Sequence, residues 1–282
     1  MDSYLLDDQL RGFIREDLEH GDITTDAIFD DSATASVCLQ AREGLVVAGM
    51  ERVASRVFSL LGGSAVSFED VMPDSARVEP GAILMRLNGP VRVLLRGERV
   101  ALNLVQRLCA IATLTRSYVD AVQGLDVVIT DTRKTTPGMR MLEKYAVLAG
   151  GGRNHRYSLS DGVLIKDNHI AACGSIRRAV EKVRKLVPHT IAIEVETDTL
   201  EQVEECLHSG VDIIMLDNMD NTLLREAVSL INNRALVEAS GGVNLQTVRG
   251  IAETGVNIIS VGALTHSAGS CDIGLDWQGP AL

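Results

Sequence analysis

A cationic segment in an otherwise acidic chain offers the residue types that bind polyanions. Residues 131–170 hold seven Lys or Arg and four Asp or Glu, a net charge of +3, whereas the whole chain of 282 residues carries −11. The acids already keep such a chain soluble, so solubility does not explain the cluster. The run DVVIT before it and the run VLIK inside it are typical of short buried strands, so Arg133, Lys134 and Lys166 are expected where strands end. Cations collected at strand ends predict a pocket for a polyanion.

Arginine and lysine donors of this kind suit carboxylates. A single Arg is more often a solvated surface charge or half of a salt bridge. Five donors in one loop-and-strand-end cluster reverse that preference, and these are Arg133, Lys134, His155, Arg156 and Lys166.

Two carboxylates are expected close to these cations. Glu196 and Asp217 end two consecutive predicted strands and should lie side by side. Such a pair can hold a hydrated Mg²⁺ that also touches a diphosphate, or it can bind ribose hydroxyls. The alternative is that the acids complement helix dipoles, which the position of Glu196 just inside its strand makes weaker.

Two loops rich in small residues follow the last two predicted strands. Ser240–Gly242 reads SGG, and residues 262–267 read GALTHS. Backbone N–H groups in such loops can bind phosphate, although the same loops also form plain turns. Because barrels often bind a sugar phosphate after their last two strands, their place in the chain favours phosphate binding.

The elements that must position these residues follow an alternating pattern from residue 126 onward. Buried strands alternate with amphipathic helices, which predicts a parallel sheet with right-handed crossovers, closed as a barrel or open and doubly wound. Only six strands are clear, fewer than the eight of a full barrel, and residues 137–160 show none. Ser175, Asp198 with Glu201, and Asn244 are the expected helix caps. The strands are expected at 126–130, 163–166, 191–196, 211–216, 235–239 and 257–261.

The first part of the chain differs in pattern. Residues 1–30 predict a helix and a loop, and residues 33–90 predict short strands interrupted by a helix over 50–61. A long helix over about 97–122 should bridge two domains. We therefore expect an N-terminal α+β domain at 1–112, a catalytic α/β domain at 113–270, and a tail at 271–282 that returns to the first domain.

Composition excludes several classes of function. A pI near 5.0 and 3% aromatic residues argue against nucleic-acid binding, and no apolar run reaches membrane-spanning length. The six histidines lack metal-ligand spacing, which excludes a zinc hydrolase, and Ser240 lacks the context of a nucleophile. The five scattered cysteines and the acidic N-terminus favour reduced thiols in the cytoplasm. A Schiff-base aldolase using Lys134 or Lys166, and a non-catalytic sensor of an anionic metabolite, remain open.

Several motifs together resemble the quinolinate phosphoribosyltransferases, also called nicotinate-nucleotide pyrophosphorylases (carboxylating). They are DTRKTTPGMRMLEKYAV, GGGRNHRYSLSDGVLIKDNHI, EVE, MLDN, SGG and SVGALTHS, with EDLEHGDITTD and GERVALNLVQRLCAIATLT earlier in the chain. The resemblance implies an N-terminal sandwich domain and an incomplete, six- to seven-stranded α/β barrel of the type II phosphoribosyltransferase kind. It also implies conversion of quinolinate and phosphoribosyl pyrophosphate to nicotinate mononucleotide, pyrophosphate and CO₂ in NAD biosynthesis.

The resemblance further implies a role for each motif residue. Arg133, His155, Arg156 and Lys166 would hold the quinolinate carboxylates, with Lys134 between the reacting partners. Glu196 and Asp217 would face ribose and Mg²⁺, and Lys134, Glu196 and Asp217 would be the catalytic residues. Arg99 would reach into the neighbouring subunit of a homodimer, which could assemble further. The other expected substrate contacts are Thr132, Thr135, Ser240, Gly241, Gly242, Val261, Gly262, Ala263 and His266.

Overall fold

The computed structural model describes residues 1–278, and the last four residues of the expected C-terminal tail, 279–282, lie outside the described part. The chain forms two compact units. Unit 1 comprises residues 1–114, 141–151 and 268–282, and unit 2 comprises residues 115–140 and 152–267. The sequence predicts domain boundaries at 112 and 270. It does not predict that residues 141–151 belong to unit 1.

Unit 1 is built on an antiparallel sheet whose four strands come from distant parts of the chain. Their order is β12 (Ile273–Trp277), β1 (Thr34–Ala41), β5 (Ile83–Pro90) and β3 (Ser67–Glu69). The C-terminal segment thus reaches the first strand, with Leu275 opposite Leu39. A second, two-stranded sheet pairs β2 (Leu45–Val46) with β4 (Arg77–Val78).

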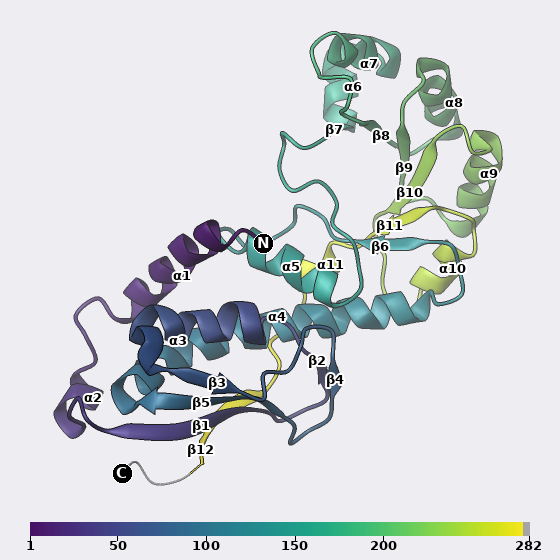
Figure 1. Ribbon diagram of the computed structural model, residues 1–282. Coiled ribbons are helices and arrows are strands. Elements are labelled where there is room, and N and C mark those ends of the chain that lie inside the picture. Colours follow the sequence, from purple (N-terminus) through teal and green to yellow (C-terminus); the bar gives the residue numbers. More distant parts are fainter. Residues whose placement is uncertain (279–282) are drawn as a thin grey trace. The chain divides into compact units, whose positions relative to one another are not determined.

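Helix α3 and the first part of α4 lie over one face of this sheet (Figure 1). In the first helix Leu6 and Leu10 are buried, whereas Leu5 is 57% exposed. Asp2 caps it by accepting the backbone N–H of Tyr4 at 2.9 Å. The elements are α1 (Ser3–Asp17), α2 (Ile23–Ile28), a π-helical turn (Met50–Ala54), α3 (Ser55–Gly62), a 3₁₀ turn (Gly63–Ala65), α4 (Val91–Ala121) and α5 (Arg140–Ala149).

Helix α4 begins six residues before the expected start at Gly97. A Cβ at Gly97 would lie 2.6 Å from the ring of Phe58, so this glycine permits close packing on α3 inside the helix and does not begin it. Val100, Leu104 and Leu108 are buried, as an apolar stripe at helical spacing predicts. Residues 91–114 of the helix belong to unit 1 and its last turns to unit 2.

Unit 2 contains the predicted parallel sheet of six strands, in the order β6-β11-β10-β9-β8-β7. Strands β7 to β11 pair in chain order, and β6 pairs with β11. This is the strand order of an α/β barrel without the β6–β7 pair. Arg153 forms an isolated parallel bridge with Thr130, and residues 137–160 contain no strand, as expected. The strands are β6 (Val128–Thr130), β7 (Val163–Ile165), β8 (Ile193–Thr197), β9 (Ile213–Asp217), β10 (Leu236–Ser240) and β11 (Ile258–Ser260).

The crossover helices lie on the outside of this sheet (Figure 1). Ser175 caps its helix as expected, but the next cap is Thr199 with Gln202 and not Asp198 with Glu201. Asn244 stabilises a turn at 244–247, and the helix after it begins only at Val248. The helices are α6 (Asp167–Cys173), α7 (Ile176–Arg184), α8 (Leu200–Ser209), α9 (Asn221–Ile231), α10 (Val248–Ala252) and α11 (Ala263–His266). Of the helices described within residues 1–278, none combines the length and apolarity needed to cross a membrane.

Candidate active site

A cavity of about 550 Å³ opens in unit 2 at the carboxyl ends of the parallel strands. Successive side chains of a strand point to opposite faces, so residues two apart share a face. Met215 with Asp217 and Glu238 with Ser240 line the cavity in this way, from neighbouring strands. The complete lining is Thr132, Arg133, Lys134, His155, Arg156, Leu164, Lys166, Glu196, Met215, Asp217, Asn218, Glu238, Ser240, Gly241, Gly242 and Ser260.

Two arginines give one wall of the cavity its positive charge. Burial, and then repulsion from Arg133, lower the pKa of Arg156, while Glu194 and Asp161 act in the opposite direction. The guanidinium of Arg156 donates to the carbonyl of Gly162 at 2.9 Å. Within residues 1–278, the buried Nε of Arg133 has no hydrogen-bond partner. The wall therefore offers cationic donors that the protein itself does not fully satisfy.

Lys166 and Glu196 form an ion pair at the cavity. The ammonium nitrogen lies 2.5 Å from Oε2 of Glu196, and the two side chains are 47% and 18% exposed. The sequence places these residues in separate roles, the lysine on carboxylates and the glutamate on ribose or metal. In the structure each is the other's partner, so a ligand must compete with this pair or bind alongside it.

Asp217 is held by the residue that follows it. Nδ2 of Asn218 donates to Oδ2 of Asp217 at 2.6 Å, and the backbone N–H of Asn218 donates to the carbonyl of Ser240. Asn218 has a φ of +54°, and the loop beside it places Gly241 at a φ of +90°. A Cβ at Gly241 would lie 2.2 Å from Oδ1 of Asn218. Gly241 is therefore required by contact as well as by backbone conformation.

Lys134 is fixed by the loop after β11. The hydroxyl of Thr265 donates to the carbonyl of Lys134 at 2.9 Å, and a Cβ at Gly262 would lie 3.0 Å from Cδ of the same lysine. Gly262 thus contacts Lys134 without lining the cavity. Thr135 accepts a hydrogen bond from Arg140, whose guanidinium also donates to the carbonyl of Tyr157.

Six predicted site residues do not line the cavity: Arg99, Thr135, Val261, Gly262, Ala263 and His266.

Two buried acids in this region were not predicted. Glu194 is 4% exposed and Glu238 is 2% exposed, and both face His155. Their signal in the sequence is a charged residue inside an apolar strand, in IEVE and LVEA. The structure also brings Leu164, Met215, Asn218 and Ser260 to the cavity, and these are residue types that carry no separate chemical signal.

The SGG loop does not lead directly into a helix, as the sequence suggests. Helix α10 begins at Val248 and has five residues, and the turn at 244–247 separates it from Gly242. Any phosphate contact here would therefore come from loop N–H groups rather than from a helix terminus. Gly241 and Gly242 have φ values of +90° and +61°, a left-handed pair whose N–H groups are available to a ligand.

A barrel-type α/β unit with a charged cavity at the carboxyl edge of its sheet has the arrangement in which enzymes of this architecture place their active sites. Residues 22–109 match the family model described as quinolinate phosphoribosyl transferase, N-terminal domain, and residues 111–276 match the C-terminal domain model of the same family. The chain belongs to the quinolinate phosphoribosyltransferase family, which confirms the resemblance found in its motifs.

Individual relatives agree with this family. The chain is 45% identical over 267 residues to a probable nicotinate-nucleotide pyrophosphorylase [carboxylating] of Bacillus subtilis, covering 95% of this chain and 91% of the relative. It is 42% identical over 273 residues to the nicotinate-nucleotide pyrophosphorylase [carboxylating] of Mycobacterium leprae, covering 95% and 96%. The crystal structure of NadC from Streptococcus pyogenes has a TM-score of 0.94 at 42% identity and covers 99% of each chain.

Proposed function

We propose that the cavity of unit 2 transfers a phosphoribosyl group to quinolinate and removes one of its carboxyl groups. The reaction converts quinolinate and phosphoribosyl pyrophosphate to nicotinate mononucleotide, pyrophosphate and CO₂. It is the activity named for relatives that match nearly the whole chain. The observation that carries the proposal is the pair of arginines, Arg133 and Arg156, which both line the cavity and whose charges repel each other.

The arginine wall suits the dicarboxylate. Quinolinate carries two adjacent carboxylates, which planar guanidinium groups bind with paired hydrogen bonds. Arg133 and Arg156 would hold these groups together with Lys166, and His155 borders the same subsite. The repulsion between the arginines would be relieved by the bound dianion, so binding gains from the arrangement of charges in the free protein.

The opposite side of the cavity suits phosphoribosyl pyrophosphate. The nitrogen of quinolinate forms a bond to the anomeric carbon as the bond to pyrophosphate oxygen breaks. Positive charge grows on the sugar, where Glu196 and Asp217 can stabilise it, and negative charge grows on the leaving group near Lys134. Thr132 and the Ser240–Gly242 loop would provide neutral donors to phosphate oxygens.

Decarboxylation then requires little from the protein beyond positioning. The nitrogen of the new nucleotide is cationic, so the electron pair left when CO₂ departs is formed beside a positive charge, and that carbon then takes a proton. The arginine wall needs only to hold the carboxylate that remains and to keep the ring oriented.

The acids of the cavity fit Mg²⁺. Glu196 and Asp217 offer carboxylate oxygens on neighbouring strands. Lys166 contacts one oxygen of Glu196 and Asn218 contacts one oxygen of Asp217, so the other oxygen of each can bind the metal. Asp217 is the better ligand, because Glu196 is already paired with Lys166. Bound there, Mg²⁺ would neutralise the charge that develops on pyrophosphate. Asp217→Asn should therefore lower turnover and raise the Mg²⁺ concentration for half-maximal rate, and leave quinolinate binding intact. Full activity with an unchanged Mg²⁺ dependence would make Asp217 a structural residue.

The reaction is tested by following pyrophosphate and CO₂ release with quinolinate or with nicotinate as the acceptor. We expect quinolinate to yield both pyrophosphate and CO₂. Nicotinate should yield no CO₂, because it lacks the carboxyl group that is lost. Release of neither product from quinolinate would overturn the proposal. Borohydride trapping would distinguish a Schiff-base enzyme, because the proposed reaction forms no covalent adduct with a lysine.

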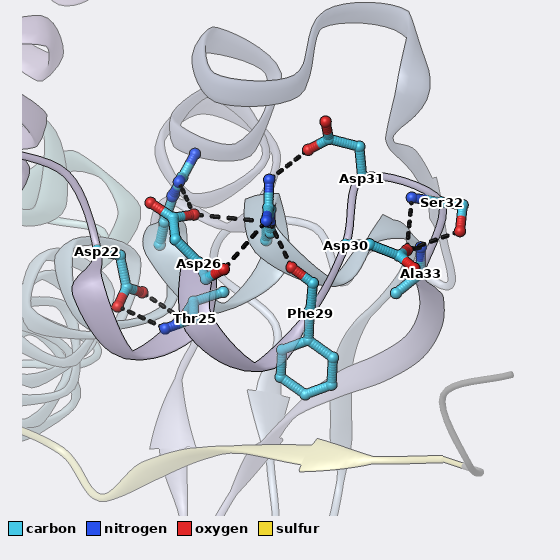
Figure 2. A network of polar contacts seen from close by, with 10 residues as sticks. Asp22, Thr25, Asp26, Phe29, Asp30, Asp31, Ser32 and Ala33 are labelled. Carbon is cyan, nitrogen blue, oxygen red and sulfur yellow. Dashed lines mark hydrogen bonds and ion pairs between the residues drawn. The ribbon is translucent and has the colours of Figure 1, made fainter.

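A homodimer with a shared site is part of the same proposal. Arg92, Arg96 and Arg99 lie four and three residues apart, on one side of α4. The first two are neutralised by the α2 region: Arg92 donates to the carbonyl of Phe29 at 2.8 Å, and Arg96 bonds the carboxylate of Asp26. Figure 2 shows the carboxylates of Asp26 and Asp31 and the backbone carbonyl of Phe29 directed toward the guanidinium groups of Arg92 and Arg96. Arg99 is exposed, and the described residues provide it with no partner, so it is available to a substrate in a neighbouring subunit.

The cytoplasm is the compartment that we propose for this enzyme. All five cysteines are free, and four of them are buried. Burial raises the pKa of Cys109 to about 12 and that of Cys206 to about 12, which keeps these thiols protonated and unreactive. Such a chain needs no oxidising environment to fold.

A further inference from the structure

His155, Glu194 and Glu238 form a buried cluster at the cavity, which His155 and Glu238 line. Nε2 of His155 is 3.2 Å from Oε2 of Glu194 on β8 and 3.6 Å from Oε1 of Glu238 on β10. Both glutamates are more than nine-tenths buried, whereas the His155 side chain is 14% exposed. Carboxylates are rarely buried without a function or a partner, and here two of them share one imidazole.

The other ring nitrogen of His155 reveals its protonation. The backbone N–H of Arg156 donates to Nδ1 at 2.8 Å, so Nδ1 is an acceptor and carries no proton. With Nδ1 as the acceptor, Nε2 is the ring nitrogen that carries a proton, and it lies 3.2 Å from Oε2 of Glu194. The backbone N–H of His155 also donates to the fully buried Asp131 at 2.9 Å. His155 is thus held at three points, and one of them is the peptide group of Arg156.

This tautomer argues against a metal ion at the cluster. The ligand atoms of His155, Glu194 and Glu238 lie within 4.8 Å of one another, close enough for one cation. A histidine that binds a metal through Nε2 normally donates a proton from Nδ1 to a neighbour. Here Nδ1 accepts, so Nε2 has no lone pair to offer. Within residues 1–278 the buried Oε1 atoms of Glu194 and Glu238 have no hydrogen-bond partner, so the ring is linked to the acids through Oε2 of Glu194.

The charges of the cluster also bear on the cavity wall. Burial, and repulsion from Glu194, raise the pKa of Glu238 to about 7. Glu194 favours the ionised form of Arg156, which burial and Arg133 oppose.

We propose that Glu194 and Glu238 are positioning residues of the quinolinate subsite, which act through the ring of His155 to hold Arg156 toward the substrate carboxylates. The inference rests on the proposed function. It assigns to the two glutamates no contact with the substrate, and it makes the hydrogen bond from Nε2 of His155 to Glu194 the critical link.

The test uses the full-length enzyme and two substitutions of Glu194. Glu194→Met removes the acceptor at nearly the same volume, whereas Glu194→Gln keeps an oxygen that can accept from Nε2. We expect Glu194→Met to raise the Kd of quinolinate, measured by calorimetry without the second substrate, at least about tenfold, with the KM of phosphoribosyl pyrophosphate within about twofold. Glu194→Gln should recover most of the affinity, and Arg156→Ala marks the effect of losing the cation itself.

The matched control is a variant that removes a buried carboxylate outside the cavity. Glu143 on α5 of unit 1 is 0% exposed and pairs with Arg107 at 2.9 Å. Glu143→Gln should alter thermal stability while the Kd of quinolinate stays within about twofold of the wild type. Nitrogen-15 NMR of the histidine rings provides a second measurement that does not depend on the variants folding, and the His155 ring of the unliganded wild type should carry its proton on Nε2.

Three results would overturn the positioning role of the glutamates. A proton on Nδ1 of His155, or an equal loss of both substrate affinities in Glu194→Met, would overturn the inference and leave the cluster purely structural. Glu194→Gln as weak as Glu194→Met would also overturn it. If the wild type binds no quinolinate, the proposed function fails instead, and the NMR result still reports whether the tautomer is correct.

Discussion

At the scale of single residues, the charged groups of this protein are most informative where they are poorly compensated. Arg133 and Arg156 repel each other beside a cavity, and Glu194 and Glu238 do the same beneath it. Each pair alone would be costly, but the two pairs have opposite sign and lie close enough for Glu194 to act on Arg156. A cavity built in this way suits the dianion of the proposed reaction.

The raised pKa of Glu238 leads to a prediction about stability. The carboxyl group titrates near pH 7 in the folded protein and near 4.5 when unfolded, so between these values the folded state binds the extra proton. Stability contributed by Glu238 is therefore greatest below about pH 4.5 and falls as the pH rises to about 7, by on the order of 1–3 kcal/mol.

Glu238→Gln should remove this fall, because an amide resembles the protonated carboxyl group and does not titrate. The measurement is thermal unfolding of both proteins from pH 5 to 8 in matched buffers. The difference in Tm between variant and wild type should shift in favour of the variant as the pH rises. A difference that is constant across this range would show that Glu238 does not titrate there.

At the scale of elements, the loops that follow β9 and β10 shape the cavity because they lie in close contact with each other. The loop at Ser240–Gly242 approaches Asn218 so closely that Gly241 has no room for a side chain. Asn218 in turn donates to Asp217, so the loop after β10 controls an acid at the end of β9. Adjacent strand ends therefore act together, which single motifs in the sequence do not express.

Gly241→Ala should displace Asn218 and release Asp217. We expect kcat/KM to fall at least about tenfold, together with a loss of about 1–2 kcal/mol of stability from the left-handed backbone. Gly138→Ala is the control, because Gly138 has a φ of +81° but no atom within 4 Å of the added Cβ. It should show the backbone cost alone. Equal effects on kcat/KM in the two variants would mean that the contact with Asn218 does not matter for activity.

At the scale of the whole molecule, the shared site of the proposed dimer can be tested by complementation. Arg99→Ala and Lys134→Ala should each be nearly inactive alone. In mixed dimers one site would keep Lys134 and receive Arg99 from the partner, while the other site would lack both residues. With random pairing, about a quarter of wild-type activity should return.

The measurement is the steady-state rate after co-expression of the two variants, with mixed dimers verified by two affinity tags. Separately purified variants, mixed without exchange of subunits, are the control. Activity that stays at the level of the single variants, although mixed dimers are present, would place Arg99 outside a site shared between subunits.

The sequence alone determined the alternation of strands and helices from residue 126 and the residues at the strand ends. Strand and helix periodicities are local, so the six parallel strands and residues such as Arg133, Lys166 and Asp217 were predicted within a few positions. The family resemblance has the same origin, because it rests on continuous motifs. The expected α+β domain and incomplete barrel are both present.

Tertiary structure decided the features that depend on distant contacts. Strand register and the curvature of the sheet bring Glu194, Glu238 and His155 together, and no local pattern encodes that meeting. The exchange of residues 141–151 into unit 1 and the pairing of Lys166 with Glu196 likewise arise from segments far apart in the chain. Whether a charged residue inside an apolar strand is buried with a partner depends on what lies across the sheet, and only the folded chain supplies that neighbour.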